Sequence, residues 1–412
     1  MFTRLKDAGE AEDGHTSRRP AAALARGLAV ALLGCWVAGC APADDGALSA
    51  AASPDLYVAN GAEGTITRVE SVSGQVIGPP LPASPGPWRM VSGPGGSLLV
   101  QAIGSAVGRQ DSPLTYLARS GGEWVTRPVA LEARAEAPLI AGDGGRYAVA
   151  AYHVRSGGAV SEAVCRLALI DLRVGAVTGT HTVCTGEESV AGLAMENGPA
   201  GLVAYLGIWH RPVAEGEPEG ARDAGGATGA TELGSRVLAV DAETGDGIGV
   251  YPLAGTPGSV ILAPGPGRTG RRLYSVEALP DPDTGTPEDS YEGQYTRASE
   301  WRLLGLNPAT LEPESEHTLS ASPFSLAVAP DGDHAYFLLD GDRVRHLDLA
   351  TGTVTGLAAL PGFGTDLAVT ATRVYVPDSR GDSVWAVDRR SGRLATSIAV
   401  GRHPIGILAS GA

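Results

Sequence analysis

The sequence predicts an all-β fold built from seven similar units, and three observations lead to this prediction. Gly and Pro together make up about a fifth of the 412 residues, against an average nearer an eighth, which is too many chain breaks for a helical protein. A short β-rich run recurs seven times, and each copy is followed by a second strand and a turn. The 43% apolar content is enough for a large core, so disorder is not expected.

The first recurring element is a run of apolar and β-prone residues that ends in small or polar residues. Its seven copies are 56–60, 98–101, 147–150, 202–205, 273–276, 336–340 and 374–378. The second strand of each unit runs into an acidic or polar residue and then Ser/Thr-Gly, most clearly at 241–245, 348–352 and 388–392. Asp or Asn bonds the turn backbone and Gly takes the left-handed conformation, so each copy predicts a hairpin turn.

The turn glycines at 74, 121, 175, 245, 352 and 392 are separated by 40 to 107 residues. The longest interval contains a degenerate copy, in which Leu311 replaces the glycine. A unit of 40 to 50 residues is typical of a four-stranded propeller blade. The longer units are explained by Gly, Pro, Glu and Asp rich insertions at about 211–235 and 280–299, inside blades four and five.

A third element, an apolar strand, opens the units at 88–91, 260–263, 324–328, 366–369 and 405–408. The last copy has no successor, and the strand at Leu56 has no predecessor. The C-terminal strand is therefore expected to join the first blade and to close the ring, which removes exposed edges between blades. We predict a seven-bladed β-propeller of four-stranded antiparallel blades over residues 55–412.

Four motifs are similar to the YVTN-type β-propeller family: Tyr57-Val-Ala-Asn60, Pro330-Asp-Gly332, Asp348-Leu-Ala-Thr-Gly352 and Val400-Gly-Arg-His-Pro404. The resemblance covers residues 55 to 410 and is strongest from 324 onward, whereas blades two to five depart from the pattern. It implies a fold more than an activity, because the family includes binding proteins, surface-layer proteins and lactonase-like relatives.

The N-terminus predicts export and lipid anchoring. Residues 1–39 carry arginines followed by an apolar run that is too short to cross a bilayer. This pattern is typical of a signal peptide. Val37-Ala-Gly-Cys40 resembles a bacterial lipobox, which implies lipidation of Cys40; an ordinary cleaved signal is the alternative. Residues 40–54 are expected to form a flexible tether. Ala41 is not the Asp that retains lipoproteins at the inner membrane, so the outer membrane or cell surface is favoured.

Composition excludes several function classes. Lys6 is the only lysine, so the mature chain has no amine for Schiff-base chemistry or for a phosphate-binding loop. The formal net charge of -15 argues against a nucleic-acid partner. The eight histidines share no metal-ligand spacing, and we expect neither a metal site nor a cofactor.

Two cysteines remain after the predicted processing, Cys165 and Cys184, and they flank the turn at Gly175. A hairpin centred on this turn pairs them, which predicts a cross-strand disulfide in an exported protein. Two buried free thiols are the alternative. A zinc pair is not expected, because two cysteines lack the four ligands that zinc takes.

A candidate ligand site is predicted at the mouth of the central channel. Arg89, Ser325 and Gly406 occupy the second positions of predicted inner strands, Asp366 begins another, and His403 lies in the turn before the last inner strand. Arg89, Asp366 and His403 are expected to contact a small anionic or polar ligand. A structural ion pair that fills the channel is the alternative.

The sequence thus predicts a lipid-anchored envelope propeller that acts as a ligand-binding or protein-interaction scaffold, with the two acidic insertions as candidate contact surfaces for an envelope protein. A lactonase-like hydrolase that works through His403, Asp366 and Arg89 is the main alternative. A third hypothesis is a subunit that accompanies a periplasmic redox enzyme.

Overall fold

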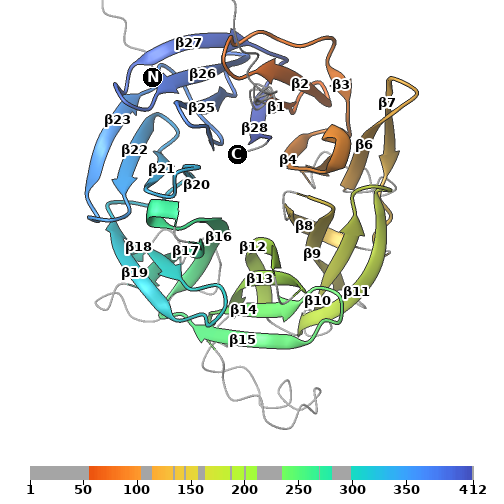
Figure 1. Ribbon diagram of the computed structural model, residues 1–412, viewed down its shortest axis with the longest axis vertical. Helices are drawn as coiled ribbons and strands as arrows, with labels where there is room; N and C mark the ends of the chain where they lie inside the picture. The colour runs from red at the N-terminus through yellow and green to blue at the C-terminus, as the bar shows by residue number, and fades with distance from the viewer. Residues whose placement is uncertain are drawn as a thin grey trace, which may run out of the picture. The chain divides into compact units, whose positions relative to one another are not determined.

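Seven four-stranded antiparallel sheets are arranged around a common centre in the computed structural model of the chain (Figure 1). The structure describes residues 55–410, apart from 104–113, 133–134, 143–144, 156–162, 186–187, 199–200, 211–233, 269 and 281–297. The predicted seven-bladed propeller is confirmed. The predicted signal peptide, Cys40 and the tether lie outside the described residues.

Each blade runs from an innermost to an outermost strand, and we number the blades 1 to 7 in the order of the lists that follow. The innermost strands are β28 (Pro404–Ala409), β4 (Pro87–Ser92), β8 (Ala135–Gly142), β12 (Glu188–Gly198), β16 (Thr256–Pro264), β20 (Ser325–Val328) and β24 (Ala368–Val369). The second strands are β1 (Asp55–Asn60), β5 (Leu98–Ala102), β9 (Tyr147–Arg155), β13 (Gly201–His210), β17 (Arg271–Pro280), β21 (His334–Leu339) and β25 (Arg373–Asp378).

The third strands are β2 (Thr65–Glu70), β6 (Leu114–Ser120), β10 (Ala163–Asp171), β14 (Arg236–Asp241), β18 (Ala298–Leu306), β22 (Arg343–Asp348) and β26 (Ser383–Asp388). The outermost strands are β3 (Leu81–Pro82), β7 (Glu123–Pro128), β11 (Ala176–Thr185), β15 (Gly247–Pro252), β19 (Pro313–Leu319), β23 (Val354–Ala359) and β27 (Leu394–Ala399). Two short 3-10 turns, Pro94–Gly96 and Pro266–Arg268, join inner to second strands. No helix of the described residues is long and apolar enough to cross a membrane.

The C-terminal strand closes the ring as predicted. β28 pairs antiparallel with β1, with Tyr57 opposite Leu408 and Val58 opposite Ile407. The Ser410 amide donates a further hydrogen bond to the Asp55 carbonyl at 2.9 Å. The two ends of the propeller chain are therefore held by the same blade, which leaves no open edge between blades 7 and 1.

The core lies between adjacent blades, because both faces of each second strand are covered. In β1, β21 and β25 every residue after the first is buried, which explains why these strands read as continuous apolar runs. Tyrosine hydroxyls also reach across to the next blade. Tyr116 and Tyr205 donate hydrogen bonds to the carbonyls of Leu172 and Pro308 at 2.5 and 3.1 Å. These bonds satisfy buried hydroxyls and fix the packing of neighbouring blades.

The predicted hairpin turns lie between third and outermost strands. The Asp348 carboxylate accepts hydrogen bonds from the amides of Ala350 and Thr351 at 3.0 and 2.8 Å, and Gly352 has φ of +72°. In blade 5 the position of this glycine is taken by Leu311, which adopts φ of +57° and is buried. The turn geometry is thus kept at the degenerate copy, and burial of the leucine offsets its unfavourable backbone conformation.

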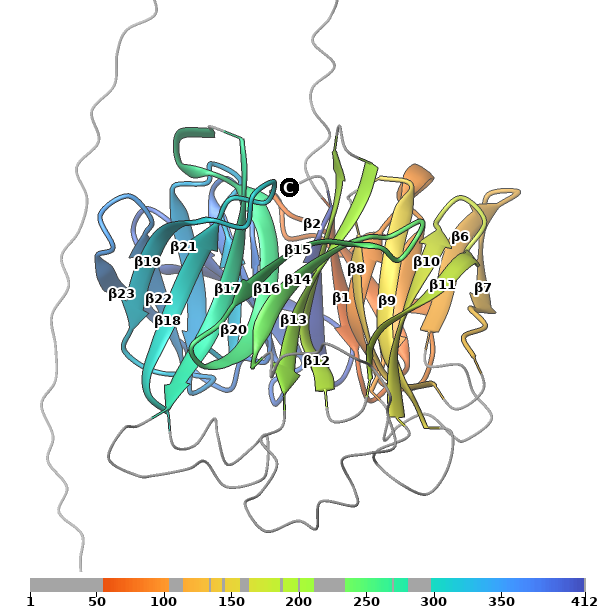
Figure 2. The same ribbon diagram turned by 90° about the horizontal axis from the view of Figure 1, so that it is seen from below.

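The two faces of the ring are not equivalent. Successive strands are antiparallel, so the passage from one blade to the next and the connection from second to third strand lie on the same face, which we call the blade-to-blade face. β13 ends on this face, whereas the chain enters β1 and leaves β28 on the opposite face, where the C-terminus is marked (Figure 2).

The two predicted insertions connect strands whose ends lie on the blade-to-blade face. Residues 211–233 and 281–297 lie outside the described residues, and both are second-to-third connections, in blades 4 and 5. Their predicted bounds need a small correction, since Pro280 belongs to β17 and Ala298 to β18.

Candidate functional site

A cavity of about 220 Å³ lies at the centre of the ring. Every blade contributes to its wall, through Ile407, Arg89, Ile140, Leu193, Ser259, Ser325 and Asp366. Nine of the fifteen lining residues have apolar side chains, and among the lining residues Arg89 and Asp366 carry the only charged side chains. A small pocket with apolar walls and a few converging polar groups is typical of a ligand site.

Asp366 precedes the innermost strand of blade 7 and is fixed by three hydrogen bonds. Its Oδ1 atom accepts from the Ser325 hydroxyl at 2.8 Å and from the Leu367 amide at 2.9 Å, and its Oδ2 atom accepts from the Ile407 amide at 3.1 Å. The carboxylate thus links the inner strands of blades 6, 7 and 1. A carboxylate offers about four acceptor positions, so about one remains for a ligand.

Burial raises the pKa of the Asp366 carboxyl, whereas the hydrogen bonds from Ser325, Ile407 and Leu367 and the charge of Arg89 oppose this shift. Desolvation destabilises the charged form, and here it outweighs the favourable interactions. The Asp366 side chain retains partial access to solvent through the cavity. Asp366 can therefore accept a hydrogen bond when ionised and donate one when protonated.

Arg89 comes from β4 in blade 2, and its guanidinium carbon lies 5.1 Å from the centre of the Trp88 ring. Both residues line the cavity. β28 packs closely against β4, since a side chain at Gly406 would collide with the Trp88 carbonyl oxygen. The arginine is thus held beside the cavity by an aromatic face and a tightly packed strand, and its planar fork suits a carboxylate or phosphate.

His403, the third predicted site residue, is not among the residues that line the cavity. It lies between β27 and β28, has φ of +55° and is exposed. Its amide donates to Asp382 Oδ1 at 2.9 Å, and its Nδ1 atom is 3.0 Å from the Ser379 carbonyl oxygen. Because a carbonyl only accepts, Nδ1 carries the proton in this arrangement. The structure thus brings Arg89 and Asp366 to one cavity, and His403 to a surface turn.

The cavity also contains residues that were not predicted as site residues, among them Trp88, Phe324, Ser259 and Thr365. Trp88 and Phe324 adjoin the two second-position residues Arg89 and Ser325 in sequence, so the inner-strand register would have indicated them. Within the described ranges, no group of three or more His, Cys, Asp or Glu side chains is placed to hold a metal ion.

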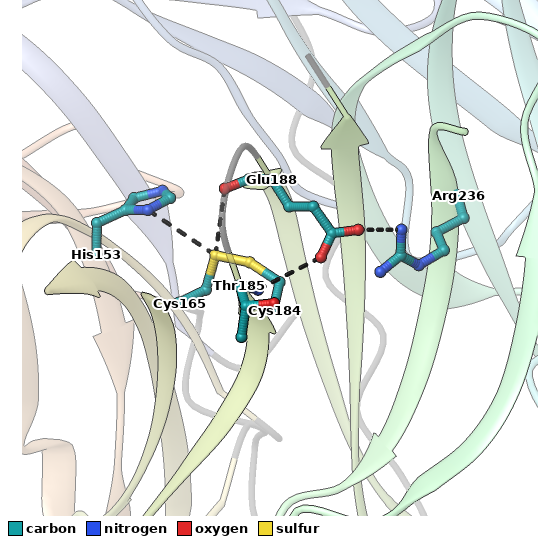
Figure 3. Close-up of a disulfide and its surroundings, with 6 residues drawn as sticks. All are labelled: His153, Cys165, Cys184, Thr185, Glu188 and Arg236. Atoms are coloured by element: carbon teal, nitrogen blue, oxygen red, sulfur yellow. Dashed lines mark hydrogen bonds and ion pairs between the residues drawn. A yellow bond between two sulfur atoms is a disulfide. The ribbon is translucent and has the colours of Figure 1, made fainter. Parts of the chain in front are cut away.

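The predicted disulfide between Cys165 and Cys184 is confirmed, and the two residues are directly opposite each other on β10 and β11, with Cα atoms 4.9 Å apart (Figure 3). It lies near the blade-to-blade face of blade 3. The Cys165 sulfur is 3.8 Å from His153 Nδ1 and 3.5 Å from the carbonyl oxygen of Glu188, the first residue of β12. The crosslink therefore borders the junction between blades 3 and 4.

Glu–Arg ion pairs occupy the same face in blades 4 and 5. Glu188 Oε1 is 2.5 Å from Arg236 Nη1, and both side chains are largely buried (Figure 3). Glu277 is fully buried, lies 2.5 Å from Arg302 Nε and accepts a hydrogen bond from the Gly255 amide. The Glu277–Arg302 pair joins β17 and β18, which flank the long second-to-third connection of blade 5, and the Glu188–Arg236 pair joins the innermost strand β12 to β14, which follows the corresponding connection of blade 4. A buried carboxylate with several donors is well satisfied, so these pairs make the strand ends rigid.

No protein-family model matches the chain, and no curated protein sequence is similar to it at a significant level. Membership of the YVTN-type family therefore stays a prediction.

Solved structures with the same fold were found at low sequence identity. A functionally unknown protein from Desulfotomaculum acetoxidans has a TM-score of 0.53 at 11% identity, over 87% of this chain and 99% of that one. Kuenenia stuttgartiensis hydrazine synthase gives 0.52 at 14%, over 84% and 92%. Dihydro-heme d1 dehydrogenase NirN, in complex with DHE, gives 0.50 at 13%, over 89% and 77%. At these identities the likeness shows the fold alone.

Proposed function

We propose that this protein is a lipid-anchored β-propeller of the bacterial envelope that binds a small polar molecule in its central cavity. The observation that carries the proposal is the presence of one guanidinium and one carboxyl, those of Arg89 and Asp366, in a cavity with otherwise uncharged walls. A ligand with an anionic group and a hydrogen-bonding group, such as a zwitterion or a hydroxy acid, matches these two side chains.

The point at which the chain enters the propeller indicates which face a lipid anchor would adjoin. β1 begins at Asp55 on the face opposite the blade-to-blade face. Fourteen residues, 41–54, separate Asp55 from Cys40, and an extended chain of this length spans at most about 50 Å. An anchor at Cys40 would therefore hold the propeller close to the membrane and attach to the face away from the two insertions, which remain available to an envelope protein.

The anchoring proposal is tested by labelling cells with palmitate and by fractionating the Cys40→Ala variant. Labelled wild-type protein and release of the variant from membranes are expected. An unlabelled chain, or a variant that stays with the membranes, would contradict lipidation.

The binding proposal is tested by thermal unfolding against a panel of amino acids and hydroxy acids. Stabilisation of the wild type by a panel member is expected, since a ligand that binds only the folded state raises Tm. The same compound should have a much smaller effect on Arg89→Gln. Arg390→Gln, which removes an exposed arginine on blade 7, is the matched control and should behave as wild type.

The hydrolase hypothesis gains no support from the described geometry. It needs His403 beside Arg89 and Asp366, whereas His403 is hydrogen-bonded in a surface turn. Turnover of sugar lactones that is lost in His403→Ala would revive this hypothesis.

A further inference from the structure

The outer rim of the ring carries a second, larger pocket of about 390 Å³, between blades 1 and 2. We call it the rim pocket and define it by Arg68, Pro79, Pro80, Arg119, Glu123 and Trp124. It lies where β3 and the β6–β7 hairpin are adjacent on the outside of the ring (Figure 1). It shares no residue with the central cavity.

The rim pocket exists because the outermost strand of blade 1 is interrupted. β3 has only two residues, whereas the outermost strands of the other blades have six to ten. The Ile77 amide still bonds the Arg68 carbonyl at 2.8 Å, but Gly78, with φ of +68°, and two prolines without amide protons separate this bond from β3. The chain therefore leaves β2 here, and the Arg68 side chain, which is 18% exposed, lines the space outside it.

Two arginines line the rim pocket, and of the two only Arg68 has an ion-pair partner in the described part of the chain, Asp55. The Arg119 guanidinium carbon is 5.5 Å from the centre of the Trp124 ring, and within the described part of the chain no side-chain hydrogen bond or ion pair involves Arg119. The nearest carboxylate oxygen to Arg68 Nε is Asp55 Oδ2, at 3.6 Å, which is too long for a hydrogen bond, and this Nε atom is buried without a partner. Glu123 is the only carboxylate in the lining.

The remaining walls are flat and apolar. Trp124 is half-buried, and Pro79 and Pro80 stand opposite the hairpin that carries it. The Thr126 hydroxyl donates to the Pro82 carbonyl at 2.8 Å, which ties β7 to β3 beside the pocket. The walls are thus fixed by both blades before any ligand arrives, and such preorganisation lowers the entropic cost of binding.

We propose that the rim pocket binds a small carboxylate with a flat apolar body. The carboxylate contacts the guanidinium groups of Arg68 and Arg119 through charge-assisted hydrogen bonds, and the apolar body stacks between Trp124 and the proline wall. An anionic ligand is favoured because two arginines and one glutamate line this pocket on a chain of net charge -15, and the Arg119 side chain has no carboxylate partner among the described residues. The site is independent of the binding proposed for the central cavity.

The test uses calorimetric titration of the purified full chain with 2-naphthoate, and with the neutral 2-naphthamide as the matched compound. Naphthoate is expected to bind with one site per chain and to weaken at high salt, and naphthamide should not bind measurably. Loss of a charge-assisted hydrogen bond in Arg119→Gln should weaken naphthoate binding by about 10- to 100-fold.

Three further variants decide where the compound binds. Arg68→Gln should weaken binding as Arg119→Gln does, whereas Arg89→Gln in the central cavity and the exposed control Arg390→Gln should leave it unchanged. Circular dichroism of each variant confirms that the fold is intact. No binding of naphthoate, equal binding of naphthamide, or full affinity in both Arg68→Gln and Arg119→Gln would overturn the proposal.

Discussion

Blades 3 to 5 differ from blades 6 and 7 in the length of their second strands, in the connection that follows these strands, and in the bonds at the blade-to-blade face. The second strands of blades 3 to 5 have nine or ten residues, and those of blades 6 and 7 have six. In blades 6 and 7 only Asp340 to Asp342 and Ser379 to Asp382 separate the second strand from the third. In blades 4 and 5 this connection contains an insertion of about 20 residues.

The bonding at the blade-to-blade face differs in the same way. Blades 3 to 5 have the disulfide and the buried pairs Glu188–Arg236 and Glu277–Arg302. In blade 6 the corresponding ion pair, Arg343–Asp340, is at least half-exposed on both sides. Long connections impose a larger loop-closure entropy on the strands that carry them. We infer that the crosslink and buried charges hold these strand ends in place, whereas tight turns suffice in blades 6 and 7.

The largest effect is expected from Arg302→Ala, which leaves the buried Glu277 carboxylate without its cation. Such an uncompensated charge should lower the free energy of unfolding by about 3–5 kcal/mol. Arg343→Ala is the matched change in blade 6 and should cost less than about 1 kcal/mol, because its pair is exposed. Denaturant unfolding of both variants measures the difference. Equal losses of unfolding free energy in the two variants would show that the buried pair in blade 5 stabilises the fold no more than the exposed pair in blade 6.

Removal of the disulfide in a Cys165→Ala, Cys184→Ala variant should lower the free energy of unfolding by about 3 kcal/mol, the value for a closed loop of about 20 residues. Urea unfolding with and without a reductant provides the measurement. The reductant should destabilise the wild type and leave the double variant unaffected. A variant as stable as the oxidised wild type would show that the crosslink does not hold blade 3.

Substitutions at the turn positions Gly352 and Leu311 should change the free energy of unfolding by smaller amounts. Gly352→Ala in blade 6 places a side chain at φ of +72° and should cost about 1–2 kcal/mol. Leu311→Gly in blade 5 relieves a similar strain but removes about 2–3 kcal/mol of apolar burial, so a net loss of about 1 kcal/mol is expected. A stabilised Leu311→Gly variant would contradict the idea that burial holds the degenerate turn.

A modest pH effect is expected at Asp366, because burial and its favourable partners oppose each other. Its pKa is raised on folding, so the folded state holds this proton more tightly than the unfolded state. The contribution of Asp366 to stability should therefore fall as pH rises above the ordinary aspartate value through the folded-state pKa. The stability difference between wild type and Asp366→Asn, measured from pH 3 to 8, should decrease over that range.

Asp388 on blade 7 is the control for this test, because its pKa is shifted in the opposite direction to that of Asp366. Hydrogen bonds from the Ser391 hydroxyl and amide lower the pKa of Asp388. Its contribution to stability should be present above the ordinary aspartate value and lost as pH falls toward the lowered pKa. A difference for Asp366→Asn that varies with pH in the same direction as that for Asp388→Asn would contradict the assignment.

Much of the fold could be predicted from the sequence, because second strands and turns have strong local signals. Every predicted second strand corresponds to one in the structure, and the pairing of Cys165 with Cys184 followed from the turn at Gly175. The inner strands β8 and β12 were missed. β12 contains Gly192, begins with Glu-Ser and ends with Glu-Asn-Gly, so it lacks a continuous apolar run. An inner strand faces the central cavity and therefore does not need a full apolar face.

The candidate site could be predicted in part for similar reasons. Arg89, in an inner strand, and Asp366, just before one, could be predicted from these positions, but the position of the His403 side chain could not. His403 adopts a positive φ. Its contacts with Ser379 and Asp382, which the local sequence does not indicate, hold it in this conformation. The rim pocket could not be predicted either, because it forms between the break before β3 in blade 1 and the β6–β7 hairpin of blade 2, which are distant in sequence.

Native mass spectrometry of protein purified from envelopes shows directly whether Arg89 and Asp366 hold a small polar molecule at the centre of the ring. One bound small molecule per wild-type chain is expected, absent from Arg89→Gln and retained in Arg390→Gln. A wild-type chain without a bound molecule, or an Arg89→Gln chain that keeps it, would contradict binding by these two residues.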